Sequence, residues 1–316
     1  MKLAFVFPGQ GSQSVGMLGA LAAEYPQVRA TFAEASAALG YDLWSLAAEG
    51  PEEKLALTEI TQPLMLTAGV AVWRTWCAYG GATPILMAGH SLGEYTALVC
   101  AGAFDFSEAV RLVADRARYM QEAVPPGQGG MAAVLGLSDD AVRNVCAEAA
   151  QGEVLEPVNF NSPAQVVIAG TAGAIARAME RAKAAGAKRA VTLAMSIPAH
   201  SSLMAPAADR LAARLQSVTV RAPIIPVIHN ADVGTAATPE AIRRILVRQI
   251  ASPVRWVEII QKMAVEGVRA VVECGPGKVL TGLNKRIARD VQCFAVEDPA
   301  ALKDVAAAVK AMGEGQ

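Results

Sequence analysis

The stretch MAGHSLGEYTALVCAG, residues 87–102, reads as an apolar strand, a tight turn and an Ala-rich helix. Its Gly-x-Ser-x-Gly pattern places Ser91 in the turn, and between a strand and a helix this pattern is typical of a nucleophilic serine. Gly89 and Gly93 permit a sharp turn that lifts the hydroxyl above the sheet edge. The backbone N–H of Leu92 would then stabilise an oxyanion, helped by the helix dipole. The alternative is a serine that only caps the helix.

Strand-like apolar runs recur along the chain, mostly separated by Ala/Leu-rich segments with an apolar spacing of about 3.6 residues. This alternation predicts an α/β fold with a mainly parallel sheet, because continuous apolar strands suit burial on both faces. With the serine turn, it predicts a large α/β-hydrolase-like domain. The predicted strands are 3–7, 84–89, 131–137, 157–161, 165–170, 188–195, 225–230, 269–275 and 292–296.

One section departs from this rhythm after the Pro/Gly-rich stretch 124–130. Helices predicted over 139–150 and 172–185 give it the order βαββαβ, which is the order of a ferredoxin-like module. We therefore expect a small ferredoxin-like domain over 126–197, inserted into a large catalytic domain built from 1–125 and 198–316.

Composition points to a cytoplasmic globular protein. The 316 residues carry a net charge of −1, which argues against a general nucleic-acid binder. No apolar run approaches the ~20 residues of a membrane span, and the N-terminus is too quickly broken by Pro8 and Gly9 for a signal peptide. The five scattered cysteines form no CxxC pair, so we expect reduced thiols and no metal site.

A catalytic serine needs a base, and the chain has three histidines. His90 adjoins the serine and should point elsewhere, as an orienting or pocket residue. His229 ends a predicted strand, where a core or supporting role is at least as fitting. His200 follows the end of another predicted strand, where α/β sites gather, so we favour it as the base. No acidic residue obviously completes a triad.

Two other segments carry candidate site residues. FVFPGQGSQ, residues 5–13, follows the first strand but lacks the pattern of a dinucleotide or phosphate loop. The backbone N–H of Gln10 could form the second half of an oxyanion hole, or the segment could be a simple tight turn. The predicted helix that includes 114–123 carries Arg111, Arg116 and Arg118, and we expect a typical arginine of this kind to be solvated. One that entered the pocket would bind a carboxylate through two donors.

Several segments together resemble one family, the malonyl-CoA:acyl-carrier-protein transacylases of fatty acid synthesis. They occur in the family's order from about residue 3 to residue 296, so the resemblance is far more specific than the serine motif alone. The segments are FVFPGQGSQ, ITQPLMLTAGVA, AGHSLGEYTAL, RARYMQEAVP, PVNFNSPAQVVIAG, SIPAHSSLM, LVRQIASPVRW and ECGPGKVLTGL.

The resemblance implies a role for each matching residue. Ser91 would be the acylated nucleophile and His200 its base, with the backbone N–H groups of Gln10 and Leu92 as the oxyanion hole. Arg116 would hold the free malonyl carboxylate, and Gln249 would orient the base through its main-chain carbonyl, which explains the missing acid. The remaining residues implied to line the pocket are Gln62, Asn159 and Asn161.

The implied activity is transfer of malonyl from malonyl-CoA to the phosphopantetheine thiol of acyl carrier protein, through a malonyl-serine. It needs no cofactor, and we expect a monomer with no nucleic-acid or membrane partner. Because the family's carrier is acidic, we expect a basic docking face, with 181–190 and 284–290 as candidates. The alternatives are a serine hydrolase or thioesterase, a stand-alone acyltransferase of a polyketide pathway, and a non-enzymatic scaffold that binds the carrier.

Overall fold

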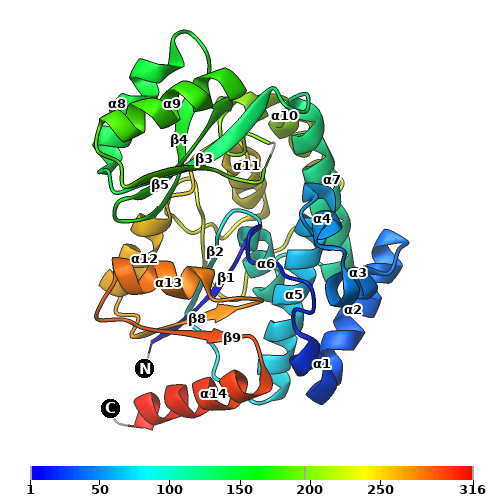
Figure 1. Ribbon diagram of the computed structural model, residues 1–316. Coiled ribbons are helices and arrows are strands. Elements are labelled where there is room, and N and C mark those ends of the chain that lie inside the picture. Colours follow the sequence, from blue (N-terminus) through cyan, green and yellow to red (C-terminus); the bar gives the residue numbers. More distant parts are fainter. Residues whose placement is uncertain (1, 196, 315–316) are drawn as a thin grey trace.

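The computed structural model describes residues 2–195 and 197–314. Ser196, inside the predicted small domain, and residues 1, 315 and 316 of the predicted large domain lie outside the described residues. The chain forms two sheets with helices packed around them (Figure 1). The helices are α1 (Gly19–Glu24), α2 (Pro26–Leu39), α3 (Leu43–Glu49), α4 (Glu52–Leu55), α5 (Thr58–Ala78), α6 (Gly93–Cys100), α7 (Phe106–Ala123), α8 (Asp139–Ala150), α9 (Ala172–Ala184), η1 (Ser202–Met204), α10 (Ala205–Gln216), α11 (Pro239–Gln249), α12 (Trp256–Val265), α13 (Val279–Ile287) and α14 (Pro299–Glu314).

The first sheet is parallel, as predicted. Every strand pairing in it is parallel, and β1 lies at its centre. Its strands, in spatial order, are β7 (Val227–Ile228), β2 (Leu86–Gly89), β1 (Leu3–Phe7), β8 (Ala270–Cys274) and β9 (Gln292–Val296).

Helices bury both faces of this sheet, which is why its strands read as unbroken apolar runs. Phe5 and Phe7 of β1 join a core that includes α5, α6 and α7. Ala4 and Val6 point to the opposite face and pack with α12 and α13. Figure 1 shows these two sets of helices on opposite sides of the sheet.

The second sheet is antiparallel and comes from one continuous section of the chain. The elements follow the predicted order, strand, helix, two strands, helix, strand. In spatial order the strands are β4 (Leu155–Ser162), β5 (Gln165–Thr171), β3 (Gly129–Leu135) and β6 (Arg189–Thr192). α8 and α9 cover the outer face with a separate hydrophobic cluster, and the inner face turns toward the parallel sheet (Figure 1).

The strand predicted over 188–195 is shorter than expected. β6 lies at the edge of the sheet and ends at Thr192, where its four-residue pairing with β3 ends. Residues 193–195 and 197–200, the described residues that follow β6, form neither helix nor strand, so His200 does not directly follow a strand end. Within the described ranges, no helix is both long and apolar enough to span a membrane.

The two sheets are joined by backbone hydrogen bonds as well as by the chain itself. The N–H of Val254 donates to the carbonyl of Val158 at 2.8 Å, and the N–H of Phe160 donates to the carbonyl of Val254 at 3.0 Å. This bridge holds β4 over the carboxyl edge of the parallel sheet, where the loops after β1, β2 and β7 meet. Ligand sites of α/β sheets form at this edge.

Candidate active site

Ser91 occupies a strained turn between β2 and α6. Its φ is 52°, in the left-handed region that residues other than glycine rarely adopt. A Cβ on Gly93 would lie 2.0 Å from the carbonyl oxygen of Phe7, and one on Gly89 would lie 1.9 Å from the backbone of Gly93. Only glycine therefore fits at either position, and the tight contact with β1 holds the serine in its strained conformation.

Asn230, just after β7, fixes this turn from the neighbouring strand. Its Oδ1 accepts from the backbone N–H of Ser91 at 2.7 Å, and its Nδ2 donates to the carbonyl of Gly89 at 2.7 Å. The side chain thus binds the turn on both sides of the hydroxyl. Asn230 is fully buried, so these hydrogen bonds face no competition from water.

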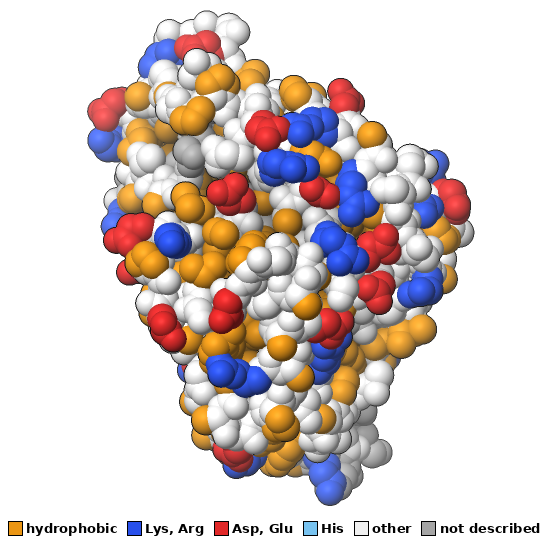
Figure 2. All heavy atoms as spheres, turned by 90° about the vertical axis from the view of Figure 1, so that its right-hand side faces the viewer, with side chains coloured by type: hydrophobic (Ala, Val, Ile, Leu, Met, Phe, Trp, Pro, Cys, Tyr) orange, Lys and Arg blue, Asp and Glu red, His pale blue; other side chains and the backbone are white. Residues whose placement is uncertain are grey.

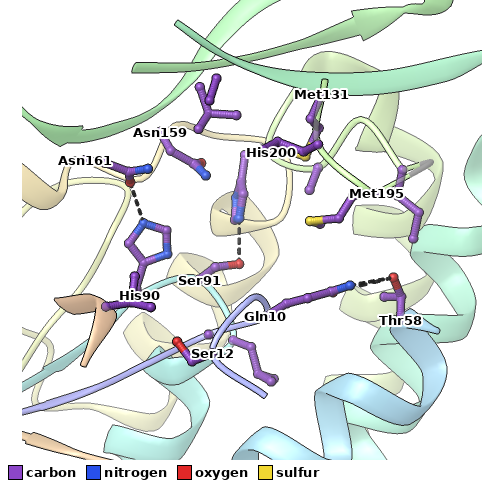
Figure 3. Close-up of a pocket in the computed structure, with 18 of the residues that line it drawn as sticks. Gln10, Ser12, Thr58, His90, Ser91, Met131, Asn159, Asn161, Met195 and His200 are labelled. Carbon is purple, nitrogen blue, oxygen red and sulfur yellow. Dashed lines mark hydrogen bonds between the residues drawn. The ribbon is translucent and has the colours of Figure 1, made fainter. Parts of the chain in front are cut away.

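His200 lies against Ser91, with Nε2 2.7 Å from the serine Oγ (Figure 3). Its Nδ1 lies 2.9 Å from the main-chain carbonyl of Gln249, which fixes the proton on Nδ1 and leaves Nε2 as an acceptor. Burial, together with the positive charge of Arg116, lowers the pKa of His200 to about 3. The ring is therefore neutral and ready to accept the serine proton.

The loop after β1 lies against the serine turn. A Cβ on Gly9 would lie 2.6 Å from the carbonyl oxygen of His90, so only glycine permits this approach. The side chain of Gln10 points to Thr58, with Nε2 3.4 Å from the threonine Oγ1 (Figure 3). Among the described residues, the backbone N–H groups of Gln10 and Leu92 have no acceptor. Both residues line the same pocket, so two unused donors border it.

Arg116 is the arginine of α7 that turns inward, and its side chain is 1% exposed. Its Nη1 donates to Oε1 of Gln62 at 2.7 Å, and its Nη2 donates to Oε1 of Gln249 at 3.2 Å. The other two arginines of this helix, Arg111 and Arg118, are exposed. Two neutral amide oxygens thus hold the guanidinium, and each terminal nitrogen keeps a second N–H for a ligand.

The charge of Arg116 is buried without a direct carboxylate partner among the described residues. Burial lowers its pKa, and the neighbouring Tyr95 and Glu94 oppose that shift. The guanidinium carbon lies 5.2 Å from the centroid of the Tyr95 ring, and burial raises the pKa of that tyrosine to about 12. A buried cation of this kind favours an anionic ligand.

The two candidate asparagines lie on β4, above the serine (Figure 3). Asn161 Oδ1 accepts from Nε2 of His90 at 2.8 Å, so this histidine faces away from Ser91, as an orienting or pocket residue would. Burial lowers the pKa of His90, which keeps its ring neutral. Oδ1 of Asn159 is buried and has no partner within the described part of the chain, so it remains available to a ligand in the pocket.

One pocket between the two sheets brings these residues together. It is lined by Ser91, His200, Arg116 and the other predicted residues except Gln249, whose amide lies behind the guanidinium. The inner face of the small sheet forms the roof, because strand alternation directs Met131 and Val167 inward. The roof carries these apolar side chains beside Asn159 and Asn161, and the pocket also holds the buried charge of Arg116, which suits a ligand with one charged end.

Two residues of the site were not anticipated from the sequence, Glu94 and Asn230. Glu94 is fully buried in the first turn of α6 and lies 2.8 Å from Nδ1 of His229, which is also fully buried and does not contact Ser91. A signal was present, since Glu94 is the one charged residue in the apolar stretch 84–104 and a buried charge needs partners.

Comparisons with known proteins agree with this geometry. Residues 4–306 match the model of the acyl transferase domain. The malonyl CoA-acyl carrier protein transacylase of Salmonella typhimurium is 57% identical over 301 residues, which cover 95% of this chain and 97% of that protein.

Solved structures give the same result. The acyl-carrier-protein S-malonyltransferase of Burkholderia pseudomallei is 58% identical, with a TM-score of 0.95, over 97% of this chain and 99% of that chain. A malonyl-transacylase in complex with a type II PKS acyl-carrier protein is 54% identical, with a TM-score of 0.95, over 96% and 98% of the two chains. The chain belongs to the malonyl CoA-acyl carrier protein transacylases, within the acyl transferase domain family.

Proposed function

We propose that this protein moves a malonyl group from malonyl-CoA to the phosphopantetheine thiol of an acyl carrier protein, through a malonyl-serine. The observation that carries the proposal is a single pocket in which the Ser91–His200 pair, at 2.7 Å, faces a buried guanidinium. Ser91 is the nucleophile, His200 the base and Arg116 the partner of the malonyl carboxylate. Gln62, Asn159 and Asn161 are the remaining pocket residues that we assign to substrate binding.

In the first half-reaction, Nε2 of His200 takes the proton of the serine hydroxyl as Oγ attacks the thioester carbon. The backbone N–H groups of Gln10 and Leu92 stabilise the negative oxygen of the tetrahedral intermediate. The carbon–sulfur bond then breaks, His200 returns its proton to the sulfur, and coenzyme A leaves as a thiol. A malonyl ester on Ser91 remains.

Gln249 takes the place of an acidic third residue. Its main-chain carbonyl accepts from Nδ1 of His200 at 2.9 Å and keeps Nε2 free for the serine proton. A carbonyl supports the imidazolium less strongly than a carboxylate. This arrangement suits a thioester, an activated acyl donor whose thiol leaving group departs more readily than the amine of an amide.

Arg116 selects the acyl group. The second N–H of each terminal nitrogen allows a two-point contact with a carboxylate while Gln62 and Gln249 keep their hydrogen bonds. An acetyl group leaves the buried cation without an anion and gains nothing from it. The selection therefore depends on charge at the far end of a short acyl group.

In the second half-reaction, the carrier thiol gives its proton to His200 and its sulfur attacks the ester carbon. The bond from that carbon to Oγ breaks, and the proton returns to Ser91. The enzyme thus alternates between a free and an acylated form, which gives ping-pong kinetics. The apolar side chains of the roof, Met131 and Val167 among them, limit the access of water to the ester until the thiol arrives.

We assign carrier docking to α13, at the mouth of the pocket. Val279 and Leu283 of this helix line the pocket, and Lys285 and Arg286 stand exposed on its last turn. In the other predicted basic segment, Arg181 is already paired with Glu148. The face over α7 and α10 is a poorer candidate, because Figure 2 shows acidic and basic side chains interspersed there.

We describe the parallel-sheet unit as α/β-hydrolase-like and the inserted unit as ferredoxin-like, with the domains 1–125 plus 198–316 and 126–197. The strand order β4-β5-β3-β6 and the separate cluster under α8 and α9 support that division. A monomeric, cytoplasmic enzyme that needs no cofactor remains a prediction from the sequence.

Intact-protein mass spectrometry tests the function directly. The enzyme is mixed with malonyl-CoA or acetyl-CoA, the adduct is located by peptide mapping, and holo acyl carrier protein is then added. We expect a malonyl adduct on Ser91 that moves to the carrier, and little acetyl adduct. Ser91→Ala is the control and should carry no adduct.

Two other results of this experiment would contradict the proposal and indicate a different function. An adduct lost to water while the carrier stays unloaded would identify a hydrolase or thioesterase. No adduct at all would leave Ser91 a structural residue and the protein a scaffold. Comparing carriers of fatty acid and polyketide synthesis in the same assay shows which of them this enzyme loads.

A further inference from the structure

A carboxylate that the transfer mechanism does not use lies beneath the nucleophile. Glu94 is 0% exposed. Its Oε1 lies 2.8 Å from Nδ1 of His229, and its Oε2 accepts from the N–H of Asn230 at 2.9 Å and from Nε2 of Gln249 at 3.3 Å. Burial of a carboxylate is costly, so contacts this complete point to a role beyond packing.

His229 does not neutralise this carboxylate. Its Nε2 is buried and has no partner among the described residues. A protonated ring would bury an unpaired N–H there, whereas a neutral ring with its proton on Nδ1 donates to Glu94 and leaves only an unused acceptor. Both oxygens of Glu94 thus accept hydrogen bonds, Oε1 from His229 and Oε2 from Asn230 and Gln249.

The side-chain amide of Gln249 bridges Glu94 and Arg116. Its Oε1 accepts from the guanidinium at 3.2 Å, while its Nε2 donates to the carbonyl of Ser91 at 2.8 Å and to Oε2 of Glu94 at 3.3 Å. If the amide were reversed, its NH2 would face the donors of Arg116 and its oxygen would face the carboxylate. Both contacts would be repulsive, so the anion and the cation together permit one orientation.

We propose that Glu94 is a positioning residue for acyl selection. It locks the Gln249 amide with the oxygen toward Arg116, and so holds the guanidinium flat with two N–H groups directed at the substrate carboxylate. This inference rests on the proposed function, because it concerns how the malonyl group is chosen. Glu94 acts through Gln249 and touches no reacting atom.

The charge of Glu94 supports the same role. Burial lowers the pKa of Arg116, and Glu94 is one of two neighbours that oppose the shift. The amide between them lets the carboxylate balance the guanidinium without occupying its ligand-binding face. A direct ion pair would instead have filled the position that the malonyl carboxylate takes.

The test compares Glu94→Asp and Glu94→Ala with the unmodified enzyme. Aspartate keeps the charge but withdraws the oxygens by about 1.5 Å, one carbon–carbon bond, which puts Gln249 out of reach. The readout is the ratio of kcat/KM for acylation of Ser91 by malonyl-CoA to that by acetyl-CoA. Thermal unfolding of each variant is measured alongside.

Glu273→Asp is the matched control. Glu273 is also 0% exposed and accepts from the backbone N–H groups of Leu280 and Thr281 at 3.1 and 2.7 Å. It caps α13 and contacts neither Gln249 nor Arg116. Shortening it should lower the melting temperature with little change in the acylation ratio, as expected for a carboxylate that only supports the fold.

For Glu94→Asp we expect a fall in the malonyl-to-acetyl ratio of about 10-fold or more, the effect of losing a hydrogen bond to a charged group. The fall should come from the malonyl reaction. Glu94→Ala should lower the malonyl-to-acetyl ratio further if this variant folds. If the alanine variant does not fold, the result for Glu94→Asp tests the inference alone. A folded Glu94→Asp enzyme with the unmodified ratio overturns the inference. Failure of the unmodified enzyme to form a malonyl-serine overturns the proposed function instead.

Discussion

Replacing Arg116 by alanine removes the charge that we assign to acyl selection. The side chain is 1% exposed and held by amide oxygens at 2.7 and 3.2 Å, so no other cation among the described residues can take its place in the pocket. The variant leaves the malonyl carboxylate in the same enclosed site without a partner. It leaves the serine, the histidine and the oxyanion donors unchanged.

The size of the effect follows from this burial. Removing one partner of a buried, hydrogen-bonded charge pair costs about 3–5 kcal/mol, which is about 10²–10⁴-fold in kcat/KM. The acetyl reaction makes no use of the guanidinium and should change by less than about 10-fold. The malonyl-to-acetyl ratio should therefore fall by at least about 10-fold, and by up to about 10⁴-fold if the acetyl reaction does not change.

The assay measures acylation of Ser91 from each donor by rapid mixing and intact mass spectrometry. Arg111→Ala is the control, because Arg111 is exposed on the same helix and should leave both rates unchanged. Equal losses for malonyl-CoA and acetyl-CoA in the Arg116 variant would mean that the guanidinium supports the fold of the site and does not select the acyl group. That result would refute the reasoning.

Four further predictions concern the base, the oxyanion donors and the carrier. Because burial and Arg116 lower the pKa of His200 to about 3, kcat/KM for acylation should show no loss near pH 6.5, where an exposed imidazole titrates; an inflection there would contradict the assigned environment. Because the pKa of His200 is lower in the folded state than in the unfolded state, the unfolded protein takes up this proton at a higher pH. The free energy of unfolding, measured by denaturant titration, should therefore fall as the pH drops from about 6.5 toward 3. Above a pH of about 6.5 this group should not change the free energy of unfolding. Gly9→Ala places a Cβ 2.6 Å from the carbonyl of His90 and should push the Gln10 N–H off the site, lowering kcat by about 10²-fold with an intact Ser91–His200 pair; an unchanged kcat would remove Gln10 from the oxyanion hole. Lys285→Ala with Arg286→Ala should raise KM for the carrier several-fold and leave acylation by malonyl-CoA unchanged, and a change in the acylation step alone would place docking elsewhere.

Much of the fold follows from local pattern. The strands predicted over 3–7 and 292–296 coincide with β1 and β9, since their apolar runs are short and flanked by turn residues. The helix predicted over 139–150 coincides with α8, where Ser138 accepts from the N–H of Ala141 as an N-cap. Hydrophobic periodicity and helix capping depend on residues that are neighbours in the sequence, so both can be predicted from the sequence alone. The serine turn belongs to the same class, because its glycines adjoin it.

The positions that depend on distant contacts required the tertiary structure. β6 stops at Thr192 because a strand extends only as far as its pairing, and β3, its one partner in the sheet, pairs with it over four residues. Ser91 and His200 are 109 residues apart, and their 2.7 Å contact depends on the small unit returning the chain to the carboxyl edge of the parallel sheet. The network around Glu94 joins α6, β7 and α11, so no local pattern could show its partners. Local spacing determines which residues share a face, whereas the partner of a buried charge is decided by how the elements pack.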